Sequence, residues 1–110
     1  MEMSRQKPFA VHVRVDEPLR PVDLILLQTM RGGPTRLEIL NVLDGGDKTC
    51  NEISGRIRVS WGAVYQHLMK MRDAGLVAET RVGRICYYRA TSWGEKAARA
   101  LGNGHDIALG

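Results

Sequence analysis

Aromatic side chains are scarce in this chain of 110 residues, which has one Phe, two Trp and three Tyr. The hydrophobic fraction of 44% must therefore form a core mainly from aliphatic side chains, and it suffices for one small domain. Apolar runs are short as well. The longest, residues 22–30, cannot span a bilayer, and the N-terminus lacks the apolar segment of a signal peptide. We therefore expect no association with a membrane.

Cysteine and the usual catalytic groups are also sparse. Cys50 and Cys86 fit no C-x-x-C pattern, which predicts a reducing, cytoplasmic environment and two small buried side chains. Together with His67 they match no known metal-site spacing, and His67 is expected to be structural. The chain has no paired carboxylates, no Ser/His/Asp set and no phosphate-binding glycine loop. We expect no catalytic residue, no metal and no cofactor, and hence no enzyme.

Positive charge is concentrated in one third of the chain. The net charge is +4, and residues 56–89 contain seven basic side chains against two acidic ones. Twelve of the sixteen basic residues are arginines, which suit planar contacts with phosphate and guanine. This distribution favours a polyanionic partner.

The sequence divides into an N-terminal arm, one domain and a tail. Residues 1–20 form the arm, in which apolar residues alternate over 9–15 as in a half-buried strand that pairs within the subunit or across a dimer. Residues 21–101 form the domain, and the glycine-rich residues 102–110 are expected to be a flexible tail.

Two helices are predicted at the start of the domain. Pro21 opens the first, which is apolar on more than one face over residues 21–31. Such a helix is either buried centrally or covered by a second subunit, and we expect a homodimer through residues 21–31 and 93–101. Pro34 opens the second helix, with Leu37, Ile39, Leu40 and Leu43 facing inward. The glycine pairs 32–33 and 45–46 are interpreted as turns.

A helix-turn-helix pattern follows. Thr49 and Glu52 match a capping box, which predicts a short helix. Ser60 and Gly75 suit the start and the end of a longer one. On this longer helix Val64, Leu68 and Met71 share one face, whereas large side chains occupy the others. A short helix, a tight turn and a longer helix are typical of DNA-binding proteins, in which the second helix lies in the major groove.

The last part of the domain predicts a hairpin and a helix. Residues 76–82 and 85–89 read as two strands joined by a Gly83-Arg84 turn. A second capping box, Ser92 to Glu95, starts a helix that runs to Leu101. The predicted fold class is mainly α with a small β-hairpin (α+β), a winged helix-turn-helix.

Residues 35–90 resemble winged helix-turn-helix repressors of the ArsR family. The resemblance rests on Pro34-Thr-Arg-Leu-Glu-Ile-Leu40, His67-Leu68, Met71-Arg-Asp-Ala-Gly-Leu-Val77 and the Gly83-Arg84 wing followed by tyrosine. Ala63-Val-Tyr65 and Tyr87-Tyr-Arg-Ala-Thr91 are similar to the PadR family, and MarR-type proteins share the architecture. The resemblance implies this fold and DNA binding.

The resemblance does not imply that this chain senses a metal. ArsR metal sensors have a Cys-x-Cys on the helix before the recognition helix, where this chain has Thr49 and Asn51 on either side of Cys50. The C-terminal helix also lacks the spaced His, Asp and Glu ligands of zinc-sensing members.

Candidate DNA contacts fall into two sets. The base-facing set is Trp61, Gly62, Tyr65, Gln66 and Met69, although Trp61 and Tyr65 could instead pack on neighbouring helices. The phosphate and wing set is Arg56, Arg58, Ser60, Lys70, Arg72, Arg81 and Arg84. The sequence thus predicts a homodimeric, sequence-specific regulator of transcription that binds double-stranded DNA, acting as a repressor. The alternatives are a winged helix used for protein–protein contact and a non-specific architectural DNA binder.

Overall fold

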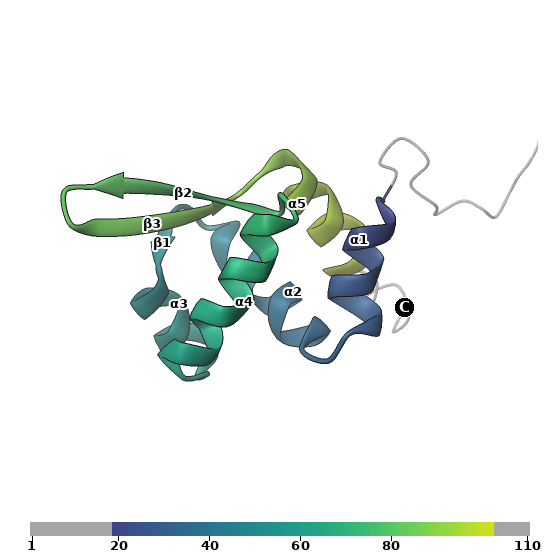
Figure 1. Cartoon of the computed structure of the whole chain (residues 1–110), viewed down its shortest axis with the longest axis horizontal. Helices are drawn as coiled ribbons and strands as arrows, with labels where there is room; N and C mark the ends of the chain where they lie inside the picture. The colour runs from purple at the N-terminus through teal and green to yellow at the C-terminus, as the bar shows by residue number, and fades with distance from the viewer. Residues whose placement is uncertain (1–18, 103–110) are drawn as a thin grey trace, which may run out of the picture.

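The computed structural model describes residues 19–102, a group of helices from which a long β-hairpin projects (Figure 1). The predicted strand over residues 9–15, most of the predicted arm and the tail from residue 103 onward lie outside the described residues. The elements in chain order are α1 (Pro21–Leu24), η2 (Ile25–Thr29), α2 (Gly33–Leu43), β1 (Lys48–Thr49), α3 (Cys50–Ile57), α4 (Trp61–Asp73), β2 (Val77–Val82), β3 (Ile85–Ala90), α5 (Ser92–Ala97) and η3 (Ala98–Gly102).

The first helix begins at Pro21, as predicted, after Arg20 in an extended conformation. Pro21 loses no hydrogen bond there, because amides of the first turn have no helical acceptor. The helix widens into η2, a π-helical turn in which the Met30 amide donates to the Ile25 carbonyl at 2.8 Å. Leu26 is buried, whereas Ile25 is 47% exposed. The helix therefore has apolar residues on both a buried and an exposed side.

Two glycines connect this helix to α2, and they have different roles. Gly32 precedes the helix with φ of +91°, a left-handed conformation that favours glycine. Gly33 is already helical, and a Cβ on it would lie 2.5 Å from the Leu27 carbonyl oxygen. The prediction that both glycines form the turn is therefore wrong for Gly33. Its missing side chain lets α2 start directly against the backbone of η2.

The hairpin belongs to a three-stranded antiparallel sheet with strand order β1–β3–β2. β2 and β3 are paired along their whole length, and Gly83 turns the chain between them with φ of +62°. The sequence predicted this hairpin but not β1, whose Lys48 pairs with Tyr88. A strand of two residues has no alternation to detect, and Thr49 was recognisable only as a helix cap.

The capping residue of α5 is Thr91, so the predicted capping box that starts at Ser92 is wrong. Thr91 Oγ1 accepts a hydrogen bond from the Gly94 amide at 3.1 Å and donates one to the Gly75 carbonyl at 2.5 Å. This second bond ties the helix start to the turn after α4 and favours Thr91 over its neighbour. Gly94 packs directly on the Leu76 carbonyl, where a Cβ has no room.

The core lies where α2, α3 and α4 meet the sheet. The three residues predicted to share the inner face of α4, Val64, Leu68 and Met71, are each fully buried at 0% exposure. Ile39, Leu40, Leu43 and Ile53 join them, and Leu37 and Ile57 pack at the edge. The predicted fold class, mainly α with a small β-hairpin, is confirmed (Figure 1).

Candidate nucleic-acid interface

α3 and α4 form the predicted helix-turn-helix pair. Thr49 Oγ1 accepts a hydrogen bond from the Glu52 amide at 3.1 Å, and the Glu52 carboxylate accepts one from the Thr49 amide at 2.8 Å. After α3, Arg58 turns the chain with a left-handed φ of 59°. Ser54 Oγ then donates to the Val59 carbonyl at 2.6 Å. Local hydrogen bonds thus fix both the start of α3 and the turn into α4.

The first turns of α4 present aromatic side chains to solvent. Ser60 caps the helix, since its Oγ accepts a hydrogen bond from the Ala63 amide at 3.3 Å. Trp61 and Tyr65 are 51% and 37% exposed. Their rings stack nearly parallel, with centroids 5.2 Å apart and an interplanar angle of 5°. The two rings therefore pack on each other and keep part of their surface open to solvent.

The other predicted base-facing residues differ in exposure. Gly62 is exposed, and a Cβ on it would meet no atom within 4 Å, so a ligand can approach the backbone closely. Gln66 is exposed too. Met69 is half-buried and packs against the core. The open surface thus consists of four of the five predicted residues, with Met69 at its edge.

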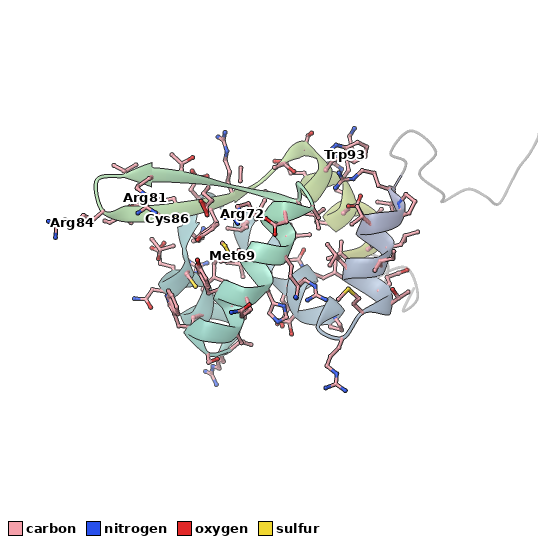
Figure 2. All side chains as sticks on the ribbon, viewed as in Figure 1. Met69, Arg72, Arg81, Arg84, Cys86 and Trp93 are labelled. Carbon is pink, nitrogen blue, oxygen red and sulfur yellow. The ribbon has the colours of Figure 1, made fainter. Side chains whose placement is uncertain are left out.

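The hairpin carries two arginines away from the helices. Figure 2 shows Arg84 at the tip of the hairpin and Arg81 farther back, near Cys86, its partner in the strand register. Both arginines are exposed, and neither forms an ion pair within residues 19–102. Their charges are therefore available to an external partner.

An open groove of about 390 Å³ lies between α4 and the hairpin. Trp61 and Tyr65 line it on the helix side, and Arg81, Arg84 and Ile85 line it on the hairpin side. The structure thus brings base-facing and wing candidates from the two predicted sets to one groove. One wall is aromatic, and the other carries two arginines together with Glu79, which is paired with Arg72.

Three further candidates for phosphate contact lie elsewhere. Arg56 and Arg58 are exposed at the end of α3, and neither has an ion-pair partner in the described part of the chain. Lys70 is exposed, but it lines a different hollow, beside α1 and η2. The structure therefore does not bring Lys70 together with the groove.

Arg72 is already engaged with acidic side chains. Its Nη1 lies 3.0 Å from a Glu79 carboxylate oxygen, and its Nη2 lies 3.3 Å from one of Asp73. These two hydrogen bonds raise the pKa of Arg72, with Glu79 as the largest cause. Phosphate would have to compete with both carboxylates, so Arg72 is the weakest member of the predicted set.

A buried arginine, which the sequence analysis did not single out, connects α4 to the segment before α2. Arg36 is only 1% exposed. Its Nε donates to the Leu26 carbonyl at 2.9 Å and its Nη2 to the Arg31 carbonyl at 2.7 Å, while Nη1 lies 2.9 Å from His67 Nδ1. Helical spacing places Arg36 on the same buried face of α2 as Ile39 and Leu40. An arginine on an apolar face is the sequence signal by which its structural role could be found.

His67 receives this contact on the α4 side. Burial lowers its pKa, and the positive charges of Arg36 and Lys70 lower it further. The neutral imidazole can accept the arginine hydrogen bond at Nδ1, whereas the protonated ring cannot. A Cβ on Gly32 would lie 2.7 Å from His67 Cε1, so the glycine is needed for this approach. His67 is structural, as predicted.

Arg20 fixes the other end of α4. Its Nη2 donates to the Ala74 carbonyl at 2.8 Å, at the C-terminus of the helix, and also bonds Asp23 at 2.8 Å. Asp23 is fully buried, at 0% exposure. The guanidinium also lies 4.4 Å from the centroid of the Trp93 ring, a cation–π contact with α5. One arginine thus joins α1, α4 and α5.

The two cysteines are free thiols. Both line the groove, and burial raises the pKa of Cys50, with Cys86 adding to the effect. A raised pKa keeps the Cys50 thiol protonated and unreactive, and Cys50 is buried as predicted, whereas Cys86 is only half-buried. Within residues 19–102, no three His, Cys, Asp or Glu side chains are grouped so that they could hold a metal ion.

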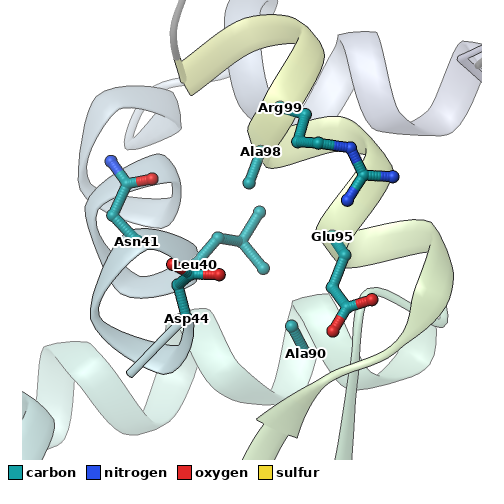
Figure 3. A pocket seen from close by; sticks show the side chains of 7 residues that line it. All are labelled: Leu40, Asn41, Asp44, Ala90, Glu95, Ala98 and Arg99. Carbon is teal, nitrogen blue, oxygen red and sulfur yellow. The ribbon is translucent and has the colours of Figure 1, made fainter. Parts of the chain in front are cut away.

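A second hollow, of about 410 Å³, lies between α2, the end of β3 and the α5–η3 segment (Figure 3). Its polar side chains carry both signs of charge, and all of them are exposed: Asn41, Asp44, Glu95 and Arg99. No buried polar group orients a ligand there. The basic and aromatic groove is therefore the better candidate site.

The helix-turn-helix pair and the hairpin after it define the class of fold: the chain has a winged helix-turn-helix architecture. Residues 33–79 match the family model of bacterial regulatory proteins of the arsR family. This is the family that the sequence resembles most. None of the helices in the described part of the chain combines the length and apolar character that a bilayer span requires.

Three known proteins illustrate the relationship. The transcriptional repressor SdpR of Bacillus subtilis is 34% identical over 55 residues, which make up 50% of this chain and 61% of SdpR. The transcriptional regulator HlyU from Vibrio vulnificus is 27% identical with a TM-score of 0.60, covering 76% of this chain and 84% of HlyU. A Lactococcus lactis ZitR variant in complex with DNA is 23% identical with a TM-score of 0.62, covering 68% and 53%. The matched segment thus spans about three fifths of SdpR.

Proposed function

We propose that this protein is a transcriptional repressor that binds specific duplex DNA sites as a homodimer in the cytoplasm. The observation that carries the proposal is the groove between α4 and the hairpin. Exposed Trp61 and Tyr65 lie on one wall, and the other carries Arg81 and Arg84, which form no ion pair within residues 19–102. An exposed aromatic pair beside two exposed arginines suits the grooves and phosphates of an anionic polymer.

Bases and phosphates would be contacted by different residues. The first turns of α4 would enter the major groove with Trp61, Gly62, Tyr65 and Gln66, and with Met69 at the edge. Phosphates would be held by Arg56, Arg58 and Ser60 beside the helix and by Arg81 and Arg84 on the wing, with Lys70 and Arg72 as peripheral contacts. Phosphate contacts position the protein, and base contacts select the site.

The relatives support this assignment. SdpR is a transcriptional repressor, and the ZitR variant was solved bound to DNA. Because the matched segment covers only 61% of SdpR, repression by this chain remains part of the proposal.

A second copy of the chain would cover the exposed side of the first helix. Val22, Leu24, Ile25 and Met30 are each at least 37% exposed and lie on one short segment. Residues 93–101 would complete this interface, as the sequence predicted. Apolar surface of this kind is costly in water and marks association sites. A two-fold dimer would place two recognition helices on half-sites about one DNA turn apart.

Selection of bound sites from random duplex DNA, followed by gel shifts over a range of salt concentrations, tests the proposal. We expect an inverted-repeat consensus and an affinity that falls steeply with salt. Sedimentation should show a dimer at micromolar concentration. A monomer would overturn the two-half-site arrangement but not DNA binding itself.

The two alternatives predict other outcomes in the same assay. A non-specific architectural binder would bind all duplexes equally, and selection would return no consensus. A winged helix used only for protein–protein contact would bind no duplex even in low salt. The hairpin arginines, which have no ion-pair partner in the described part of the chain, favour the DNA-binding proposal over the second alternative.

A further inference from the structure

We propose that the Trp61–Tyr65 stack recognises the 5-methyl group of thymine in the major groove, so that the protein selects sites by an apolar contact. This inference rests on the proposed DNA binding and adds the chemical group that is recognised.

The aromatic stack has no role in the core that would explain it. Both rings lie on the first two turns of α4, stacked at 5.2 Å and within 5° of parallel. They are 51% and 37% exposed, and neither is among the buried residues of the core. A folded helix gains nothing from leaving Trp61 exposed at its first position, so a partner is the better explanation.

The surroundings of the stack identify that partner as DNA. Ile85 on the hairpin is 49% exposed and also lines the groove, which adds apolar surface. Arg81 and Arg84 border the same groove without ion-pair partners in the part of the chain that the structure describes. Lipid or an apolar protein surface would bury these charges, whereas the phosphates on both sides of a DNA groove would pair with them.

Within the major groove, only one base carries an apolar group on its exposed edge. That group is the thymine methyl, because guanine, cytosine and adenine present hydrogen-bond donors and acceptors there. The open aromatic surface of α4 has no arginine, lysine or asparagine that would bond guanine or adenine bidentately. Gln66 is the one amide on this surface, and it suits adenine, the partner of thymine. Both contacts therefore favour A·T pairs under the start of α4.

The test replaces thymine by deoxyuridine, which removes only the methyl group. Sites selected from random duplex DNA are synthesised with uracil at each thymine in turn, and affinity is measured by fluorescence anisotropy at one salt concentration. We expect the wild-type protein to lose about fourfold in affinity for each contacted methyl, the value of one buried methylene-sized group. Thymines outside the region under α4 should be insensitive.

Two variants of the stack and two controls assign the effect to it. Trp61→Ala and Tyr65→Ala should bind thymine and uracil sites equally well, and their exposed positions should leave the melting temperature close to that of the wild type. Gln66→Ala should retain the preference for the methyl group. Arg84→Ala should weaken binding to both sites by the same factor, because it contacts phosphate.

Three outcomes would overturn the inference, and they are distinguishable. If the wild-type protein binds selected sites but does not discriminate thymine from uracil, the methyl contact is wrong and the proposed function stands. If no duplex is bound in low salt, the proposed function fails and the inference fails with it. If a preference for the methyl group persists in Trp61→Ala and Tyr65→Ala, its source lies outside the stack, and the inference is wrong.

Discussion

Two groups of arginines in this chain have the same chemistry and opposite surroundings. Arg36 is buried and Arg20 is partly buried, and both donate to backbone carbonyls of three different segments. Arg81 and Arg84 extend from the hairpin and form no ion pair in residues 19–102. Arg20 and Arg36 bond to α4, whereas the charges of Arg81 and Arg84 are accessible to a ligand.

Positive charge alone therefore does not identify a binding surface. An arginine whose donors all have partners is part of the framework, and its loss should affect folding. An exposed arginine without partners contributes little to folding, and its loss should affect binding only. The following predictions test this division, in order of their expected effect on the free energy of unfolding.

Replacement of Arg36 should have the largest effect. Arg36→Met fills a similar volume but leaves the Leu26 and Arg31 carbonyls and His67 without their donor. Buried acceptors without partners destabilise a fold, so we expect unfolding in urea to require about 3 kcal/mol less free energy. The matched control, Arg84→Met, should change it by less than about 0.5 kcal/mol. Equal effects of the two variants would contradict the division into two groups.

Replacement of Arg20 should have the next largest effect. Arg20→Met leaves the fully buried Asp23 carboxylate without its ion pair and removes the bond to the Ala74 carbonyl. Because part of the arginine side chain is exposed to water, we expect a loss of about 2 kcal/mol, measured by the same denaturation. The double variant Arg20→Met/Asp23→Asn should recover part of this loss, since it removes the unpaired charge. A double variant less stable than the single one would argue against the ion pair.

Protonation of His67 should have a smaller effect that depends on pH. Burial and the charges of Arg36 and Lys70 lower its pKa in the folded state below the ordinary value of 6.5. The stabilisation from the neutral ring is therefore complete above pH 6.5 and is lost as the pH falls from there to the folded-state pKa. Urea denaturation between pH 7.5 and about pH 5 measures this loss.

A non-titrating variant provides the control for His67. Asparagine offers an oxygen acceptor close to the position of Nδ1, so His67→Asn should keep much of the contact with Arg36. The difference in stability between wild type and variant should then change over the pH window below 6.5. A constant difference would show that His67 does not titrate differently on folding.

Removal of Arg84 should have the smallest effect on folding and a clear effect on binding. Arg84→Ala should leave the free energy of unfolding within about 0.5 kcal/mol of the wild type. If Arg84 contacts phosphate, the slope of log affinity against log salt should decrease by about one unit per subunit. Arg72→Ala is the comparison, because Arg72 is already paired with Glu79 and Asp73. A larger change in slope for Arg72 than for Arg84 would reverse the assignment.

Much of the fold could be predicted from the sequence, because many of its signals are local. Thr49 and Ser60 bond to amides three residues ahead, and Gly75 turns the chain after α4 with φ of +78°. The start of α5 could not be predicted in this way. Thr91 rather than Ser92 caps it, because Thr91 also bonds the Gly75 carbonyl, which lies 16 residues away.

The candidate site could be predicted in part for the same reason. Helical spacing was enough to put Trp61, Tyr65 and Gln66 on the outer faces of α4, and a glycine turn put Arg84 at the tip of a hairpin. Met69 was expected to be as open as these residues, but it is half-buried against the core. Its exposure depends on packing with other elements, which a helical period does not contain.

The sequence by itself determined the order and type of the main elements: capped helices, a helix-turn-helix pair and a hairpin with a basic tip. These features depend on hydrogen bonds and periodicities within a few residues, so a linear pattern contains them. The roles of the arginines, in contrast, depend on the tertiary structure: Arg20 and Arg36 bond to the backbone, whereas Arg81 and Arg84 are exposed on the hairpin. The acceptors of Arg36 lie up to 31 residues away, and only the folded chain brings them within hydrogen-bonding distance.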